Sequence, residues 1–427
     1  MEQLFDFIAS SPTAYHAAAH IASLLDGAGF ARLEEGAPWK LESGSGYYVV
    51  RNSSSLIAFR IPDTILPPES VMIAAAHLDS PALKIKENAV LKGPGAYLRL
   101  SAERYGGMIY ASWFDRPLSV AGRVMIRKDG GVRTALADLR EPCALIPHVA
   151  IHMNRSINDG YSCNPAVDLL PIWGLGGNEG DFRESVAKSA GCRPGDILAS
   201  DLFLYNPARG YAWNGLISAP RLDDLECAYA VLSGFLEAGF PHALPVAAFF
   251  DNEEVGSQTK QGAASPFLLD TLTRVADAFS LDLRGLLASG MMLSCDNAHG
   301  IHPNHPEYAD KNHTVTLNGG VVVKYNANQK YTSDAVSAAL FKLICEEAGV
   351  PVQLYANRAD IAGGSTLGNI STTQVALNTV DIGLAQLAMH SAFETAGEKD
   401  PDYMIRALTA FFGKSLRAEG NGAYSLL

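Results

Sequence analysis

The sequence lacks the features that mark nucleic-acid-binding, membrane-spanning and disulfide-stabilised proteins. Its 427 residues carry 33 Lys and Arg against 45 Asp and Glu, and this net charge of −12 gives no general attraction to nucleic acid or anionic membranes. No apolar run approaches the roughly 20 residues that a membrane span needs. The six cysteines form no CxxC pair, so neither a zinc ribbon nor a disulfide framework is indicated. We expect reduced thiols in a cytoplasmic protein without nucleic-acid or membrane partners.

The chain divides into three segments of different character. Hydrophobic residues make up 48% of it, enough for one large core and a smaller one. Residues 1–90 begin with helical periodicity and end in the apolar run VMIAAA, which is typical of a buried strand. Residues 91–215 contain many Gly and Pro breaks between short β-like segments such as GMIYASWF. In residues 216–427, helical patterns alternate with buried-strand patterns. This organisation predicts one α/β domain with a mostly parallel sheet, split in sequence by an inserted β-rich module.

Side chains that bind metals follow several of the predicted strands. In doubly wound sheets, ligands sit beyond the carboxyl ends of the strands. The residues concerned are His77 and Asp79 after VMIAAA, Asp251, Glu253 and Glu254 after PVAAFF, Asp296 after GMMLSC, His390 after TVDIGLAQLAM, and Asp223 and Asp224 before a predicted helix. Glu253 and Glu254 are neighbours, and two such charges at a buried strand end need a compensating cation.

Each of these residues has an alternative structural explanation. His77 alone fits a buried, hydrogen-bonded histidine, Asp223 fits a helix N-cap, and Asp296 fits a turn. The recurrence of the feature at several strand ends favours a metal centre instead. Two imidazoles with several carboxylates suit Zn²⁺, with Mn²⁺ or Co²⁺ as substitutes. Asp79, two residues after His77, is predicted to accept the free imidazole N–H and so to orient that ligand.

Five motifs occur in the order that is found in one known family. They are AAAHLDSPALKIK, SAPRLDDLECAYA, FFDNEEVGSQTKQGAAS, SCDNAHGIHPN and LAMHSAFE. With SPTAYHAA near the start and IPHVAIHMNRSIN in the middle segment, the chain resembles the aspartyl aminopeptidase family over nearly its whole length. The resemblance implies a cytoplasmic dinuclear zinc exopeptidase with a three-layer α/β catalytic domain and an inserted β-rich dimerisation domain. It also implies a homododecamer built from dimers, with the active sites facing an enclosed chamber.

The resemblance also implies roles for individual residues. One zinc would be held by His77, Asp223 and Asp296, and the other by Asp223, Glu254 and His390. Asp223 would therefore bridge the two ions, although the adjacent Asp224 remains an alternative. Glu253 matches the general base.

Further residues match substrate-contacting positions of the family. His152 corresponds to a histidine that reaches a neighbouring subunit's active site, with His148 as the competing choice. Lys324 corresponds to a lysine in the pocket for an acidic side chain, and His299 to a histidine near the site. Thr366, in AGGSTLG, is predicted either to line the substrate pocket or to belong to a tight loop.

The expected activity is the removal of N-terminal Asp or Glu from peptides. One alternative is a carboxypeptidase or N-acyl amino acid deacylase of the same dinuclear zinc fold, in which Lys324 would bind a substrate carboxylate. A second is a metal-stabilised shell protein without turnover, which the presence of Glu253 disfavours. The histidines at 302, 305 and 313 invite a metal interpretation, but two prolines and the lack of helical periodicity favour a polar loop near the site or a subunit contact.

Overall fold

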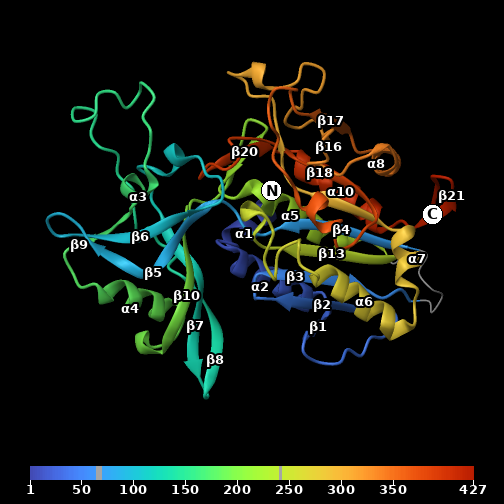
Figure 1. Ribbon diagram of the computed structural model, residues 1–427, viewed down its shortest axis with the longest axis horizontal. Coiled ribbons are helices and arrows are strands. Elements are labelled where there is room, and N and C mark those ends of the chain that lie inside the picture. Colours follow the sequence, from blue (N-terminus) through green and yellow to red (C-terminus); the bar gives the residue numbers. More distant parts are fainter. Residues whose placement is uncertain (64–69, 240–242) are drawn as a thin grey trace.

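The computed structural model describes residues 1–63, 70–239 and 243–427. Figure 1 shows two lobes, a larger one built around a long mixed sheet and a smaller one formed by the middle of the chain. Within the described ranges, no helix has both the length and the apolar character required to cross a membrane. All six cysteines are free thiols.

A nine-stranded sheet forms the centre of the larger lobe. Its strands, in spatial order, are β1 (Ala31–Leu33), β2 (Gly46–Arg51), β3 (Ser55–Arg60), β13 (Leu244–Phe250), β4 (Val71–His77), β14 (Met291–Cys295), β18 (Asn378–Gly383), β16 (Val321–Tyr325) and β17 (Val352–Ala356). The four strands β13, β4, β14 and β18 run parallel to one another. Their carboxyl ends therefore meet at one edge of the sheet.

Helices cover both faces of this sheet, which makes the lobe a three-layer structure. One face is covered by α1 (Glu2–Ala9), α2 (Ala14–Gly27), α5 (Leu222–Glu237), α8 (Ala335–Glu347) and α10 (Asp400–Phe412). The other is covered by α6 (Phe267–Phe279), α7 (Leu283–Ala288) and α9 (Leu367–Ser371). Because strand side chains alternate between faces, Ala74 and Ala76 pack in the first core, whereas Ile73 and Ala75 pack in the second.

The smaller lobe is the inserted module. Its antiparallel sheet has the order β8 (Gly131–Asp138), β7 (Ser119–Lys128), β10 (Ile197–Tyr205), β5 (Ala82–Lys92), β6 (Tyr97–Tyr105) and β9 (Ile172–Leu175). The helices α3 (Pro165–Asp168) and α4 (Gly180–Ser189) belong to it, and it has its own hydrophobic core. β5 starts before residue 91 and β10 ends before residue 215, so the sheet is shifted towards the N-terminus relative to the predicted segment.

Two small sheets complete the fold. One has the order β11 (Tyr211–Trp213), β12 (Leu216–Ala219), β20 (Glu394–Gly397), β19 (Ala385–Leu387) and β15 (Ala298–His299), and the other pairs β21 (Leu416–Gly420) with β22 (Ala423–Leu426). Short 3-10 helices occur at η1 (Tyr110–Trp113), η2 (Pro194–Asp196), η3 (Glu253–Val255) and η4 (Pro306–Tyr308).

Two local expectations about strands are wrong. GMIYASWF forms no strand in the module, because η1 occupies Tyr110–Trp113. The run before His390 is not one strand, because β18 ends at Gly383 and the chain then crosses into the five-stranded sheet as β19. His390 therefore reaches the edge of the main sheet from a neighbouring small sheet.

Candidate metal centre

Two imidazoles present the same nitrogen to a common point. His77, the last residue of β4, donates from Nδ1 to the backbone carbonyl of Asp79 at 3.0 Å. His390 donates from Nδ1 to the backbone carbonyl of Gly107 at 2.9 Å. Because a carbonyl oxygen can only accept, Nδ1 carries a proton in each ring, and Nε2 is the nitrogen left with a lone pair when the ring is neutral. Both rings are thus held in the orientation and tautomer that a metal ligand needs.

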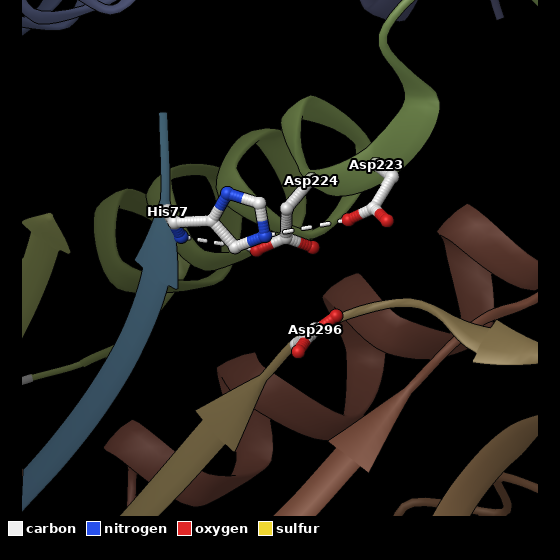
Figure 2. Close-up of side chains that lie close together, drawn as sticks. All are labelled: His77, Asp223, Asp224 and Asp296. Atoms are coloured by element: carbon white, nitrogen blue, oxygen red, sulfur yellow. Dashed lines mark hydrogen bonds and ion pairs between the residues drawn. The ribbon is translucent and has the colours of Figure 1, made fainter. Parts of the chain in front are cut away.

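The carboxylate of Asp223 lies between the two imidazoles. Its Oδ1 is 3.3 Å from Nε2 of His77, and its Oδ2 is 3.4 Å from Nε2 of His390. Figure 2 shows His77, Asp223, Asp224 and Asp296 converging from the ends of β4 and β14 and the start of α5. A second group of potential ligands contains Asp223, Glu254 and His390, with Nε2 of His390 3.4 Å from Oε2 of Glu254. Asp223 is common to these two groups, and a third group joins His77 to Glu253 and Glu254.

When the imidazoles are neutral, these contacts bring hydrogen-bond acceptors face to face. Nε2 of each histidine then has a lone pair and points at carboxylate oxygens that cannot donate, so either a proton or a metal ion must lie between the two atoms. Oδ1 of Asp223, Oδ1 of Asp224 and Oε1 of Glu254 are buried without a hydrogen-bond partner among the described residues. Unpaired buried acceptors are costly unless a cation lies between them. The residues therefore fit divalent cations, and imidazole with carboxylate is a donor set that suits zinc.

The pKa values of two carboxyl groups are raised, as expected where negative charges are crowded together in a buried site. Burial, together with the charges of Asp296, Asp79 and Asp223, raises the pKa of Glu253 to about 8. Burial and the neighbouring Asp223 raise the pKa of Glu254 well above its usual range. Without a cation, such groups take up protons instead of remaining ionised at neutral pH.

Asp223 and Asp224 are not equivalent, although they are adjacent and joined by a cis peptide bond. Asp223 belongs to two of the three ligand groups, whereas Asp224 belongs only to the one with His77 and Asp296. Oδ2 of Asp224 also accepts the backbone N–H of His77 at 3.0 Å. The geometry therefore favours Asp223 over Asp224 as the shared ligand.

Glu253 and Glu254 open the 3-10 helix η3 directly after β13. Asn252, which precedes them, has a left-handed backbone with φ of 64° and so turns the chain sharply at the strand end. Glu254 faces His390 and, like Glu253, also lies within reach of His77. The two neighbouring glutamates differ because only Glu254 belongs to the group with Asp223 and His390.

Asp79 has a different partner set from the predicted one. The sequence predicts that its carboxylate orients His77, but the nearer acceptor is its backbone carbonyl, with Oδ1 3.5 Å from the ring nitrogen. The carboxylate instead accepts the backbone N–H groups of Glu253 and Glu254, each at 3.1 Å. Asp79 therefore supports both His77 and the glutamate turn.

The predicted substrate-binding residues lie around Asp296, but two of them have engaged polar groups. The Lys324 side chain is 2% exposed and donates from Nζ to the carbonyls of Asp296 and Asn297, at 2.9 and 3.3 Å. The Thr366 hydroxyl donates to Asp381 at 2.5 Å, which fits the loop interpretation. His299 lies in β15. Burial, together with the charge of Lys324, lowers the pKa of its imidazole.

The other histidines lie outside the ligand groups found in the described part of the chain. His148 is held within the module by Asp115, with Nδ1 2.6 Å from Oδ2, and by stacking on Phe114. His152 is exposed on the same loop of the module. In the HxxH segment, His305 pairs with Glu307 and His313 with Asp310, as expected for a polar loop.

Sequence patterns missed two residues that organise the centre. Glu394 is 1% exposed and accepts the backbone N–H groups of His390 and Asp223, at 2.7 and 3.1 Å. It belongs to the motif LAMHSAFE, so its position next to His390 was a usable signal. Tyr105, at the end of β6, donates a hydrogen bond from its hydroxyl to Asp79 at 2.6 Å. No sequence pattern predicts this contact.

Known proteins that this chain resembles in sequence belong to one family. The sequence model of the family described as "Aminopeptidase I zinc metalloprotease (M18)" matches residues 7–412. A "Probable M18 family aminopeptidase 2" of Clostridium acetobutylicum is 41% identical over 423 residues, covering 96% of this chain and 98% of its own. A protein described in the same words from Ectopseudomonas mendocina is 41% identical over 422 residues, covering 96% of this chain and 97% of its own.

Solved structures have the same fold. The chain resembles one in "Cryo-EM structure of the Ape4 and Nbr1 complex", with a TM-score of 0.92 and 32% identity, over 96% of this chain and 85% of that one. It also resembles one in "Structure of S. cerevesiae mApe1 dodecamer", with a TM-score of 0.85 and 28% identity, over 96% of this chain and 95% of that one. The predicted α/β fold with an inserted β-rich module is confirmed.

Proposed function

Since the chain belongs to the M18 family of zinc aminopeptidases, we propose that it removes single residues, preferentially Asp or Glu, from peptide N-termini at a dinuclear zinc centre. The observation that carries this proposal is the carboxylate of Asp223 between the Nε2 atoms of two histidines. One zinc would be held by His77, Asp223 and Asp296, and the other by Asp223, Glu254 and His390. Mn²⁺ and Co²⁺ suit the same donors.

In the proposed reaction, Glu253 acts as the general base. When bound, the zinc pair lowers the pKa of a water molecule and polarises the substrate carbonyl. Glu253 accepts the proton of that water and then passes it to the leaving amine. Two features support this role. Its carboxylate lies within reach of His77, and it is the neighbour of a predicted ligand without belonging to the group around His390.

Residues outside the metal centre would contact the substrate and form the subunit interfaces. We propose that His152 contacts substrate in a neighbouring subunit and that the protein forms a dodecamer built from dimers, since the similar S. cerevesiae mApe1 structure is that of a dodecamer. Three apolar side chains flank His152 on the exposed loop, Val149, Ile151 and Met153, and Met153 is 83% exposed. Apolar exposure of this kind is typical of a subunit contact. Measuring the mass of the protein in solution tests the assembly.

A pair of reporter peptides tests the proposed activity against its alternatives. The metal-loaded protein is expected to cleave a reporter with a free N-terminal Asp and to leave the N-acetylated form intact. The reverse pattern would indicate a deacylase, and release of the C-terminal residue would indicate a carboxypeptidase. If neither end of any peptide is cleaved while zinc is bound, the protein is a shell without turnover.

We propose that Lys324 contributes to the preference for acidic residues. Its ammonium is 3.7 Å from Oδ2 of Asp296, and it places a positive charge next to a predicted zinc ligand. Because two of its three N–H donors are bonded to the carbonyls of Asp296 and Asn297 and its side chain is buried, it acts at a distance rather than by direct contact with substrate. In Lys324→Met, the ratio of kcat/KM for Asp over Leu reporters is expected to fall about tenfold, the order for one charge acting through a protein interior.

The control for this prediction is Lys342→Met. Nζ of Lys324 lies 5.2 Å from the ring centroid of Tyr331, and Lys342 lies in the same way over the ring of Tyr325, but on α8 outside the ligand groups. Lys342→Met should leave the ratio of kcat/KM for Asp over Leu reporters unchanged. Equal losses for the Asp and Leu reporters in Lys324→Met would assign Lys324 to support of the Asp296 segment alone.

A further inference from the structure

Tyr105 connects the inserted module to the candidate metal centre. It is the last residue of β6, and its ring packs edge-on against Phe203 of β10, with ring centroids 5.4 Å apart. Its hydroxyl donates to Oδ2 of Asp79 at 2.6 Å and accepts from Nδ2 of Asn252 at 2.9 Å. The ring therefore belongs to the smaller lobe, whereas both hydrogen-bond partners belong to the larger one.

The carboxylate of Asp79 joins Tyr105 to the backbone of the two glutamates. Its Oδ1 accepts the N–H of Glu253, and its Oδ2 accepts both the N–H of Glu254 and the hydroxyl of Tyr105. Asp79 is only 5% exposed, so these bonds are shielded from water. One buried carboxylate thus fixes the backbone of the proposed base and of the proposed ligand.

Asn252 closes the network on the other side. It immediately precedes the glutamates, and its Oδ1 accepts from Thr259 Oγ1 at 2.9 Å and from Gln261 Nε2 at 2.7 Å. The hydroxyl of Tyr105 therefore touches the residue that starts the turn and the residue that holds its amides.

The neighbouring module backbone makes a similarly close approach. Gly106 has φ of +74°, and a Cβ added there would lie 3.1 Å from Cβ of Glu254. Any larger residue would press on the proposed ligand in a backbone conformation that L-residues rarely adopt. Module residues 105–107 are therefore packed against Asp79, Glu254 and His390 rather than merely near them.

We propose that Tyr105 is a positioning residue for the reaction: by holding the Asp79 carboxylate, it sets the direction of Glu253 relative to Glu254. This inference rests on the proposed function, because it assigns Glu253 the role of base. A phenol donating to a carboxylate at 2.6 Å is a short, charge-assisted bond of the stronger class. Small displacements of a catalytic group cost rate even when substrate binding is intact. The inserted module thereby contributes to catalysis within its own chain.

The test compares two tyrosine variants that lose the same atom. Tyr105→Phe is expected to lower kcat about tenfold, with KM and bound zinc unchanged. Tyr205→Phe is the control, because Tyr205 also donates to a carboxylate, that of Asp138 at 2.7 Å, without contacting the glutamate turn. In an Asp79→Asn background, Tyr105→Phe should have little further effect on kcat, because the hydroxyl acts through Asp79.

Amide exchange gives a readout that does not depend on activity. With and without bound metal, hydrogen–deuterium exchange at the amides of Glu253 and Glu254 is expected to accelerate in Tyr105→Phe and not in Tyr205→Phe. Unchanged exchange, an equal fall in kcat in both backgrounds, or loss of fold or metal in Tyr105→Phe alone would overturn the proposal. If the wild-type protein cleaves no N-terminal reporter, the proposed function fails, and exchange still decides whether Tyr105 holds the turn.

Discussion

Replacing Glu253 with glutamine is expected to lower kcat about a thousandfold, within the range attributed to a general base. The amide has nearly the same shape as the carboxylate but cannot accept the proton of the attacking water. The backbone bond from Glu253 to Asp79 does not involve the side chain, so the turn should persist. Metal content and melting temperature should therefore match the wild type, measured together with single-turnover rates at saturating substrate.

Two comparison variants make this result specific. Glu254→Gln should weaken zinc binding, because Oε2 of Glu254 lies 3.4 Å from Nε2 of His390 in the second ligand group. Glu226→Gln should keep near wild-type activity, because Glu226 is a fully buried carboxyl outside all three ligand groups. Normal turnover by Glu253→Gln, or loss of its zinc, would show that Glu253 is not the base.

Removal of the metal is expected to abolish activity and to make stability fall as the pH rises from about 5 to 9. Without a cation, Glu253 and Glu394 have pKa values of about 8 in the folded protein, both raised chiefly by burial, against 4.5 for an ordinary glutamate. Between these values the folded state holds more protons than the unfolded state. The free energy of unfolding therefore decreases with increasing pH.

His390 acts in the same direction. Its carboxylate neighbours outweigh the opposing effect of burial and raise its pKa to about 10 from 6.5. The stability that its charge provides is complete below pH 6.5 and is lost as the pH approaches 10. Asp223, whose pKa is lowered by His390 and His77 against the effect of burial, changes stability only at more acidic pH.

Melting temperatures at about pH 5.5 and about pH 8.5, with and without zinc, check this expectation. The chelated protein should melt several degrees lower at the higher pH than at the lower one, and added Zn²⁺ should reduce that difference and restore activity. Glu226, whose pKa burial raises to about 8, lies outside the ligand groups and keeps part of the pH dependence in both forms. Co²⁺ and Mn²⁺ serve as further additions. An identical pH dependence of the loaded and chelated proteins would contradict a cation-compensated carboxylate cluster.

Much of the centre was predictable because its residues lie at strand ends. β4 ends at His77, β13 ends directly before Asp251, and β14 ends directly before Asp296. Because the three strands are parallel, these ends meet at one edge of the sheet. His390 is predicted both from the apolar run before it and from its motif, but the assignment of that run to one strand is wrong. A buried run of that length reads equally well as one strand or as two short ones that cross between sheets.

Strand periodicity and the polar residues at strand ends are local patterns, and they predict the α/β class, the split by a β-rich module and the residues able to bind zinc. The tertiary structure alone shows that Asp223 lies between two imidazoles, that Lys324 is buried against the segment of Asp296, and that Tyr105 reaches Asp79 from the other lobe. These relations join residues far apart in the chain. They depend on side-chain direction and on the packing of one lobe against the other, which no local pattern encodes.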